Sequence, residues 1–311
     1  MDEFKHNADH PRRILITGAS GLLGEVLCRA ASAEWAVFGL YRRHPLVVPG
    51  VVGIQTDLTD SRAMEKTLDT VEPAAVIHAA AMAQPAECEK HPDISEAVNV
   101  RVPEMLARCC AEREIPMVFT STDLVFDGLQ APYGEDDPPG PVCVYARHKV
   151  RAEREVLGHH PHALVCRMPL LFGISAYHTG NFTVQLLHAM QQGRRVKLFT
   201  DEFRTPVDTR SAALGILGLL GKAEGVLHLG GRTRVSRHEM GLMIAARLGV
   251  DPRLVEPVTI ASMALAVTRS PDCSLDSRRA YHLGYDPVPL PTAIARVVQE
   301  FETMTDKSVL T

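Results

Sequence analysis

The sequence predicts an α/β protein with a doubly wound parallel sheet and a smaller C-terminal lobe. Short apolar runs alternate with helical patterns from residue 12 to residue 121. Continuous apolar strands separated by helices are typical of a parallel sheet covered on both faces. A glycine-rich turn follows the first run, and beyond residue 128 the alternation becomes irregular. The length of 311 residues is sufficient for two domains.

The elements follow from this alternation in chain order. We expect strands at 14–16, 37–41, 51–55, 74–78, 117–121 and 163–168, with helices at 22–33, 62–68 and 94–113. Proline and glycine make 130–142 a loop, and a helix carrying Tyr145 and Lys149 follows it. Further helical patterns lie at 182–192, 209–220, 236–248 and 290–302, and a short strand at 226–229 interrupts them.

These elements predict a division of the chain. Residues 1–11 are expected to be a flexible tail, and 12–173 a nucleotide-binding domain to which a strand near 225–231 returns. Segments 174–224 and 232–311 are expected to form the substrate-binding lobe.

Composition disfavours several functions. The net charge of −4 leaves no basic excess for nucleic acid. The charged N-terminus does not resemble a signal peptide, and the apolar stretches at 74–83 and 211–221 are shorter than the roughly 18 residues of a membrane span. The seven cysteines show no C-x-x-C spacing, so we expect reduced, buried thiols in a cytoplasmic protein. No H-E-x-x-H occurs among the histidines, and no metal is expected.

The turn after the first strand predicts a phosphate site. Gly18 permits a tight turn, Gly21 lets the backbone approach a pyrophosphate, and Gly24 lets the helix pack close to the sheet. The following helix N-terminus offers free N–H groups to an anion. A simple tight turn is the alternative. The same segment adds further candidate cofactor contacts: Ser20, Leu22 and Leu23.

The end of the second strand indicates which dinucleotide is bound. An NAD site usually has a carboxylate there, but this strand ends in Arg42 and Arg43. Two guanidinium groups suit a 2′-phosphate, so NADP is favoured over NAD; two solvated arginines are the alternative. Asp57, followed by Leu58, could accept from the adenine amino group or could cap the next helix.

Tyr145 and Lys149 indicate proton chemistry. Their i, i+4 spacing places them on one helix face, although a surface pair is the alternative. The ordinary tyrosine pKa is about 10, and a neighbouring ammonium is expected to lower it. Lys149 could also hold the nicotinamide ribose. Thr122 ends the fifth strand, where its hydroxyl could polarise a substrate carbonyl.

The strings TGASGLLG, HAAAMAQPAECEKHP, STDLVFDG, YARHK and RMPLLFG resemble those of extended short-chain dehydrogenase/reductases with a Rossmann fold. Within that NAD-dependent epimerase/dehydratase superfamily, the sequence is most similar to the dTDP-4-dehydrorhamnose reductase branch. Ala146 and His148 replace the glycine and serine usual around the tyrosine.

The resemblance implies roles for individual residues. Thr122, Tyr145 and Lys149 match the family's catalytic triad, and Asp123 matches an acidic neighbour found in this branch. Arg204 resembles an arginine that contacts the diphosphate of a nucleotide sugar. The remaining matches are to cofactor-lining positions: Ala79, Ala80, Ala81 and Asn99.

The resemblance implies an NADP-dependent reductase of a nucleotide-linked keto-sugar, with Tyr145 as proton donor and a homodimer as a possible assembly. A non-catalytic NADP-binding regulatory subunit is an alternative, because the β subunit of methionine adenosyltransferase resembles the same branch. A sugar-nucleotide epimerase or dehydratase is another, because Asp123 follows Thr122.

Overall fold

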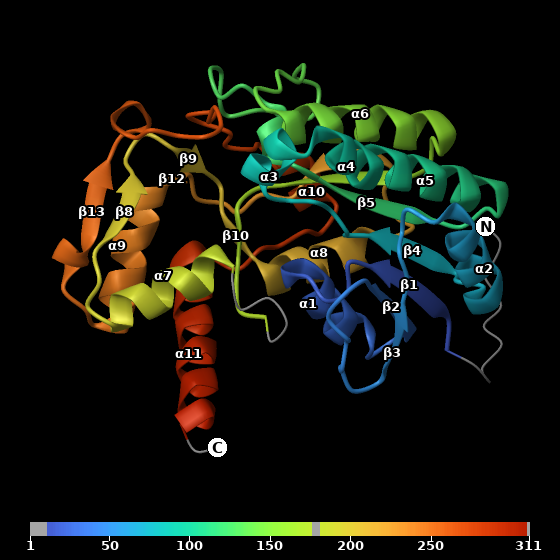
Figure 1. Cartoon of the computed structure of the whole chain (residues 1–311), viewed down its shortest axis with the longest axis horizontal. Coiled ribbons are helices and arrows are strands. Elements are labelled where there is room, and N and C mark those ends of the chain that lie inside the picture. Colours follow the sequence, from blue (N-terminus) through green and yellow to red (C-terminus); the bar gives the residue numbers. More distant parts are fainter. Residues whose placement is uncertain (1–10, 176–180, 310–311) are drawn as a thin grey trace.

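The computed structural model describes residues 11–175 and 181–309, so residues 1–10 of the expected tail lie outside the described residues. Its centre is a seven-stranded parallel sheet in the order β11-β6-β5-β4-β1-β2-β3 (Figure 1). The strands are β1 (Arg13–Thr17), β2 (Ala36–Tyr41), β3 (Val51–Gln55), β4 (Ala75–His78), β5 (Met117–Thr122), β6 (Leu164–Met168) and β11 (Gly225–His228). The expected fold class is confirmed.

Helices cover both faces of this sheet because strand residues alternate in direction. On one face, Ile14 and Ile16 belong to a hydrophobic cluster with helices α1 (Leu22–Ala31) and α8 (Thr209–Leu219). On the other, Leu15 packs in a second cluster with helices on the opposite side (Figure 1). The helices of this second face are α2 (Ser61–Val71), α5 (Val102–Glu112) and α6 (Val144–His159).

The smaller lobe has its own hydrophobic cluster. Its main elements are α7 (Phe182–Gln191), β8 (Val196–Phe199), α9 (Arg237–Leu248), β13 (Val255–Val258) and α11 (Leu290–Val309). Strand β8 pairs with β13, and β9 (Phe203–Arg204) pairs with β12 (Val235–Ser236). Two short strands, β7 (Leu171–Phe172) and β10 (Val207–Asp208), pair with each other where the chain passes between lobe and sheet. None of the helices in the described ranges combines the length and apolar character needed to cross a bilayer.

Helix α8 corrects the expected division of the chain. The segment 174–224 was expected to belong to the lobe, but α8 packs against α1 in the sheet cluster. Tyr285 lies in the same cluster, and α10 (Arg278–His282) packs beside β11. The amphipathic pattern of α8 indicated that one face is buried, but not whether the sheet or the lobe covers that face.

The helix expected at 94–113 is interrupted. It consists of α4 (Pro92–Glu96), a π-helical turn η1 (Ala97–Arg101) and α5, and the short helix α3 (Pro85–Lys90) precedes it. π-helical turns are rare, occur mostly as single turns inside α-helices, and are frequent at functional sites. The sequence therefore predicted helix here, but not the bulge that orients Asn99.

A buried ion pair joins β5, β6 and α6 at the carboxyl end of the sheet. Arg167 on β6 donates from Nη2 to Glu153 Oε2 at 2.8 Å and from Nε to both carboxylate oxygens. Ser121 on β5 also donates to Glu153. Both charged side chains are buried, so each depends on the other for neutralisation.

Replacing Arg167 by methionine should therefore lower the free energy of unfolding by about 3–5 kcal/mol, because Glu153 would remain buried without its cation. Urea denaturation followed by circular dichroism measures this loss. The double variant Arg167→Met/Glu153→Leu should recover part of it, since no unpaired charge remains. Losses that simply add in the double variant would show that the pair is not coupled.

Candidate active site

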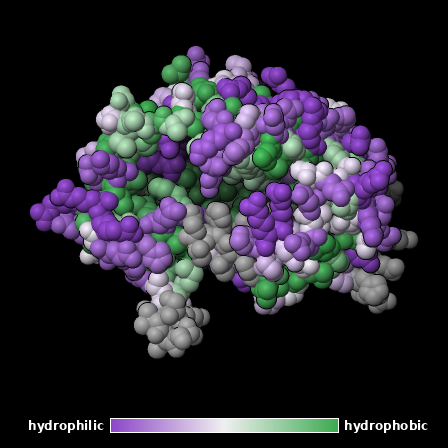
Figure 2. Space-filling view, viewed as in Figure 1, coloured by the Kyte–Doolittle hydropathy of each residue, from purple (hydrophilic) through white to green (hydrophobic). Residues whose placement is uncertain are grey.

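A cleft of about 760 Å³ opens between the sheet and the lobe, where the strands end. The space-filling view shows the surface hollowed there (Figure 2). Residues expected from both the glycine turn and the catalytic set line it, and lobe residues form the opposite wall. The expected residues among its lining are Gly21, Leu22, Leu23, Gly24, Ala79, Ala81, Thr122, Asp123, Tyr145, Lys149 and Arg204.

The glycine turn forms a close backbone cradle. Gly18 has a φ of +68°, and a Cβ there would lie 2.7 Å from the backbone of Ala80. A Cβ on Gly24 would lie 2.0 Å from the Gly18 carbonyl oxygen. Gly21 N donates to that oxygen at 2.9 Å, and Gly21 begins the wall of the cleft at the N-terminus of α1. A cradle free of side chains at a helix N-terminus fits the pyrophosphate of a dinucleotide. Ser20, in the same turn, does not line the cleft.

The residues expected to select NADP lie outside the cleft lining. Arg42 is exposed, and its Nη2 lies 3.3 Å from Asp57 Oδ2. Asp57 also accepts hydrogen bonds from Thr59. The expectation that Asp57 might cap the next helix is wrong, because Asp60 caps α2 by accepting from Ala63 N at 3.1 Å. A carboxylate thus lies beside Arg42, although it follows β3 rather than β2. Arg43 is exposed as well, and Leu58 lines a separate, smaller cavity.

Asn99 holds the loop that follows β4. Its amide oxygen accepts from Met82 N at 2.9 Å, and its amide nitrogen donates to Met82 O at 3.1 Å. It also donates to Ser95. Asn99 is buried in the π turn and does not line the cleft. It therefore positions Ala79 and Ala81 through the backbone of their loop.

Strand β5 presents Thr122 and Asp123 at its carboxyl end. Thr122 Oγ1 donates to Asp123 Oδ1 at 3.2 Å and accepts from Leu124 N, so it caps the 3₁₀ turn Asp123–Val125. Asp123 Oδ2 lies 3.3 Å from Arg204 Nε. Burial raises the pKa of Asp123 to about 6, while Arg204 and Thr122 oppose this shift. Asp123 can therefore exchange a proton near neutral pH.

Helix α6 places Tyr145 in its first turn and Lys149 one turn later. Glu89 accepts from Val144 N at 2.8 Å and so satisfies a free N–H at the start of the helix. Lys149 is buried; its Nζ donates to Thr120 O at 2.6 Å and lies 4.0 Å from the centre of the Phe119 ring. Burial lowers the pKa of Lys149 to about 7, against the opposing effect of Glu153. The lysine thus titrates within the physiological range.

The expected lowering of the tyrosine pKa is not found. Burial, followed by the charge of Asp123, raises the pKa of Tyr145 well above its ordinary value, and interaction with Thr122 opposes the shift only in part. Tyr145 therefore stays protonated at neutral pH. This is the form that a proton donor requires.

Three charged residues of the cleft lie outside the expected set of site residues. Glu202, Arg237 and Arg269 line the lobe side. They come from separate segments, and no spacing rule connects them. The sequence signals were the string around Arg204, which contains Glu202, and Arg269, which precedes Ser270 and Pro271.

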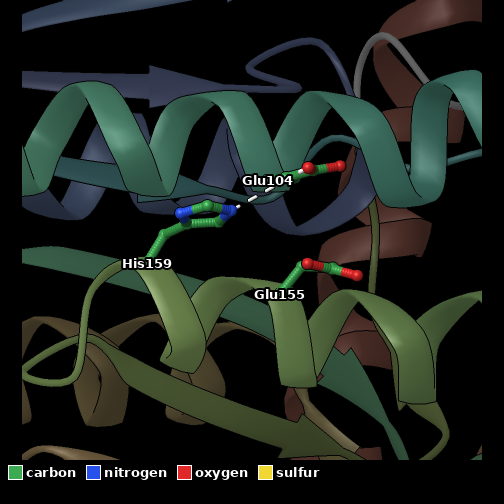
Figure 3. Close-up of side chains that lie close together, drawn as sticks. All are labelled: Glu104, Glu155 and His159. Atoms are coloured by element: carbon green, nitrogen blue, oxygen red, sulfur yellow. Dashed lines mark ion pairs between the residues drawn. The ribbon is translucent and has the colours of Figure 1, made fainter.

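One group of side chains in the described part of the chain has metal-binding residue types (Figure 3). Glu104 on α5 lies near Glu155 and His159 on α6, with 3.9 Å between His159 Nε2 and Glu104 Oε1. Glu104 is paired with Arg101 and Glu155 with Arg151. Because arginines already balance both carboxylates and none of the three lines the cleft, we assign no metal to this group. All seven cysteines lie in the described ranges, and each is a buried free thiol, as expected.

Known proteins are similar to this chain in sequence. A probable low-salt glycan biosynthesis reductase of Haloferax volcanii is 32% identical over 84% of this chain and 88% of its own length. The methionine adenosyltransferase 2 subunit beta of Danio rerio is 27% identical over 88% of this chain and 85% of its own length.

A crystal structure of a hypothetical dTDP-4-dehydrorhamnose reductase from Sulfolobus tokodaii superposes with a TM-score of 0.78 at 30% identity, covering 89% of this chain and 98% of that one. Residues 12–303 match the family described as the RmlD substrate binding domain. A match across both the sheet and the lobe shows that the chain belongs to the RmlD substrate binding domain family.

Proposed function

We propose that this protein is an NADP-dependent oxidoreductase that reduces a keto group of a nucleotide-linked sugar. The observation that carries the proposal is the meeting of the glycine cradle with Thr122, Tyr145 and Lys149 in one cleft. The similarity to the Haloferax volcanii reductase and to the Sulfolobus tokodaii structure supports it.

The side chains of the cleft have separate roles in the proposed reduction. NADPH, bound at the cradle, supplies the hydride. Tyr145 donates the proton to the substrate oxygen, and the Thr122 hydroxyl polarises the same carbonyl. Lys149, one turn along α6, holds the nicotinamide ribose, and its ammonium stabilises the phenolate left on Tyr145. Asp123 lies between this group and the lobe, and Arg204 orients it.

A regulatory, non-catalytic role is the second candidate. It is favoured by the similarity to the methionine adenosyltransferase subunit, which extends over 88% of this chain. Both candidates require the nucleotide cradle, but only the reductase requires proton transfer at Tyr145.

The first prediction concerns the cofactor. NADPH should bind more tightly than NADH, because Arg42 and Arg43 can contact a 2′-phosphate. Arg42→Ala should weaken NADPH binding by about 1.5–3 kcal/mol, the range for hydrogen bonds to charged groups. Isothermal titration calorimetry measures both. Arg253→Ala is the control, since Arg253 is exposed and pairs with Asp251 outside the cleft. Equal affinity of the unaltered protein for the two cofactors would contradict the assignment.

The second prediction concerns proton transfer. Tyr145→Phe should lower kcat about 10²- to 10⁴-fold, the usual contribution of a general acid, because it removes the hydroxyl but keeps the ring. Thr122→Ala should have a smaller effect, and neither change should much alter NADPH affinity. The assay follows NADPH oxidation with a panel of nucleotide 4-keto-sugars. Undiminished turnover in Tyr145→Phe would refute the tyrosine mechanism. Tight NADPH binding without any turnover by the unaltered protein would favour the regulatory role.

The third prediction concerns pH. Lys149 carries its proton below its pKa of about 7 and loses it above. The charged form stabilises the Tyr145 phenolate, so kcat/KM should fall as pH rises through about 7. Lys149→Arg, whose charge does not titrate in this range, should lack that inflection whatever its absolute rate. A profile of the unaltered enzyme that is flat between pH 6 and 8.5 would exclude this role for Lys149.

A further inference from the structure

The lobe wall of the cleft gathers three arginines around one buried carboxylate. Glu202 Oε1 lies 3.3 Å from Arg204 Nη2 and 3.5 Å from Arg237 Nε, and its Oε2 lies 2.9 Å from Arg269 Nη1. Burial acts to raise the pKa of Glu202, but the three guanidinium groups together hold it below its ordinary value. Glu202 is therefore ionised and fixes the position of each arginine.

Arg204 is saturated by partners within the protein. Its Nε lies 3.3 Å from Asp123, its Nη1 donates to Phe203 O at 2.6 Å, and its Nη2 donates to Ser270 O at 3.1 Å. Only 4% of the side chain is exposed. Each of its three nitrogens already has a partner, so Arg204 is suited to hold Asp123 and Glu202 in place.

Arg237 is engaged on one side only. Its backbone N donates to Glu202 O at 3.1 Å, and its Nε faces the Glu202 carboxylate. Its Nη1 is shielded from solvent and has no hydrogen-bond partner among the described residues. The guanidinium carbon lies 4.9 Å from the ring centre of Phe182, another lining residue of the cleft. A buried donor without a partner is destabilising, and more so when it is charged.

The charges at this wall favour an anion. Arginines 204, 237 and 269 outnumber the two carboxylates, Glu202 and Asp123, by one. Burial lowers the pKa of Arg237, Arg204 and Arg269 lower it further, and Glu202 only partly compensates. Arg237 lines the cleft and 17% of its side chain is exposed, so a negative group in the cleft would balance the surplus charge at its guanidinium.

We propose that Arg237, held in place by Glu202, binds an anionic oxygen group of the substrate. Arg204 has instead a positioning role. The inference rests on the proposed function, since a nucleotide-linked sugar carries such a group in its diphosphate. A carboxylate on the sugar has the same chemistry and is the other group that could supply the anionic oxygen.

The test is a binding measurement on protein saturated with NADP⁺, so that nucleotides cannot occupy the cofactor cradle. Titration calorimetry compares the binding of UDP, dTDP, GDP, CDP and ADP. The nucleotide that binds most tightly is then used with the variants. Arg237→Gln should weaken its binding at least 10-fold, and Arg237→Lys should weaken it less. The matched control is Arg234→Gln, because Arg234 pairs with Asp272 at 2.7 Å and does not line the cleft. NADP⁺ affinity and melting temperature should stay unchanged in the lysine variant.

A second pair of ligands distinguishes a diphosphate from a sugar carboxylate as the anionic group that Arg237 binds. With the preferred base, the nucleotide-linked glucose and its glucuronic acid counterpart differ only in one carboxylate. If Arg237 binds the diphosphate, Arg237→Gln weakens both equally; if it binds a sugar carboxylate, only the acid is affected. The inference is overturned if the unaltered protein binds none of these ligands, or if the Arg237 variants bind them as it does. Binding that depends on Arg237 without turnover of any keto-sugar would refute the proposed function while leaving this subsite intact.

Discussion

Neutralisation of buried charge is the constraint on which the active cleft depends. Lys149, Asp123 and the Glu153–Arg167 pair are all withdrawn from water where the parallel strands end. A buried charge must be balanced within the protein. Arg167 balances its partner inside the sheet domain, but Asp123 is balanced by Arg204, which belongs to the lobe. The electrostatics of the strand ends thus require the lobe to dock where it does.

The same constraint sets the protonation states in the cleft. Burial brings Lys149 and Asp123 towards neutrality from opposite directions, to pKa values of about 7 and about 6. Tyr145 is held in its protonated form by burial and by the Asp123 charge. The protonation state of Tyr145 therefore depends on Asp123, which can itself titrate.

Features encoded by local patterns could be predicted from the sequence. The strands of the sheet and the turn at Gly18 follow from apolar runs and glycine spacing, and the structure contains them. The association of α8 with α1, the π turn at Asn99 and the arginines around Glu202 depend on contacts between distant segments. An amphipathic pattern shows that a face is buried without showing against what. The direction of the shift in the Tyr145 pKa was predicted wrongly for a related reason, because burial cannot be deduced from the i, i+4 spacing.

The packing of α8 against α1 determines how the chain can be divided. After its first entry into the lobe, the chain returns to the sheet with α8 and β11, crosses to the lobe with α9 and β13, and returns again with α10 before ending in α11 (Figure 1). The apolar surface of α1 is thus covered by a segment that follows it by nearly two hundred positions. A fragment ending at residue 173 would leave that surface open to water, so the half that contains the sheet is not a module that can be separated by one cut. The repeated crossings also connect the sheet and the lobe through several chain segments. These connections limit how far the cleft can open without unfolding the helices that cover the sheet.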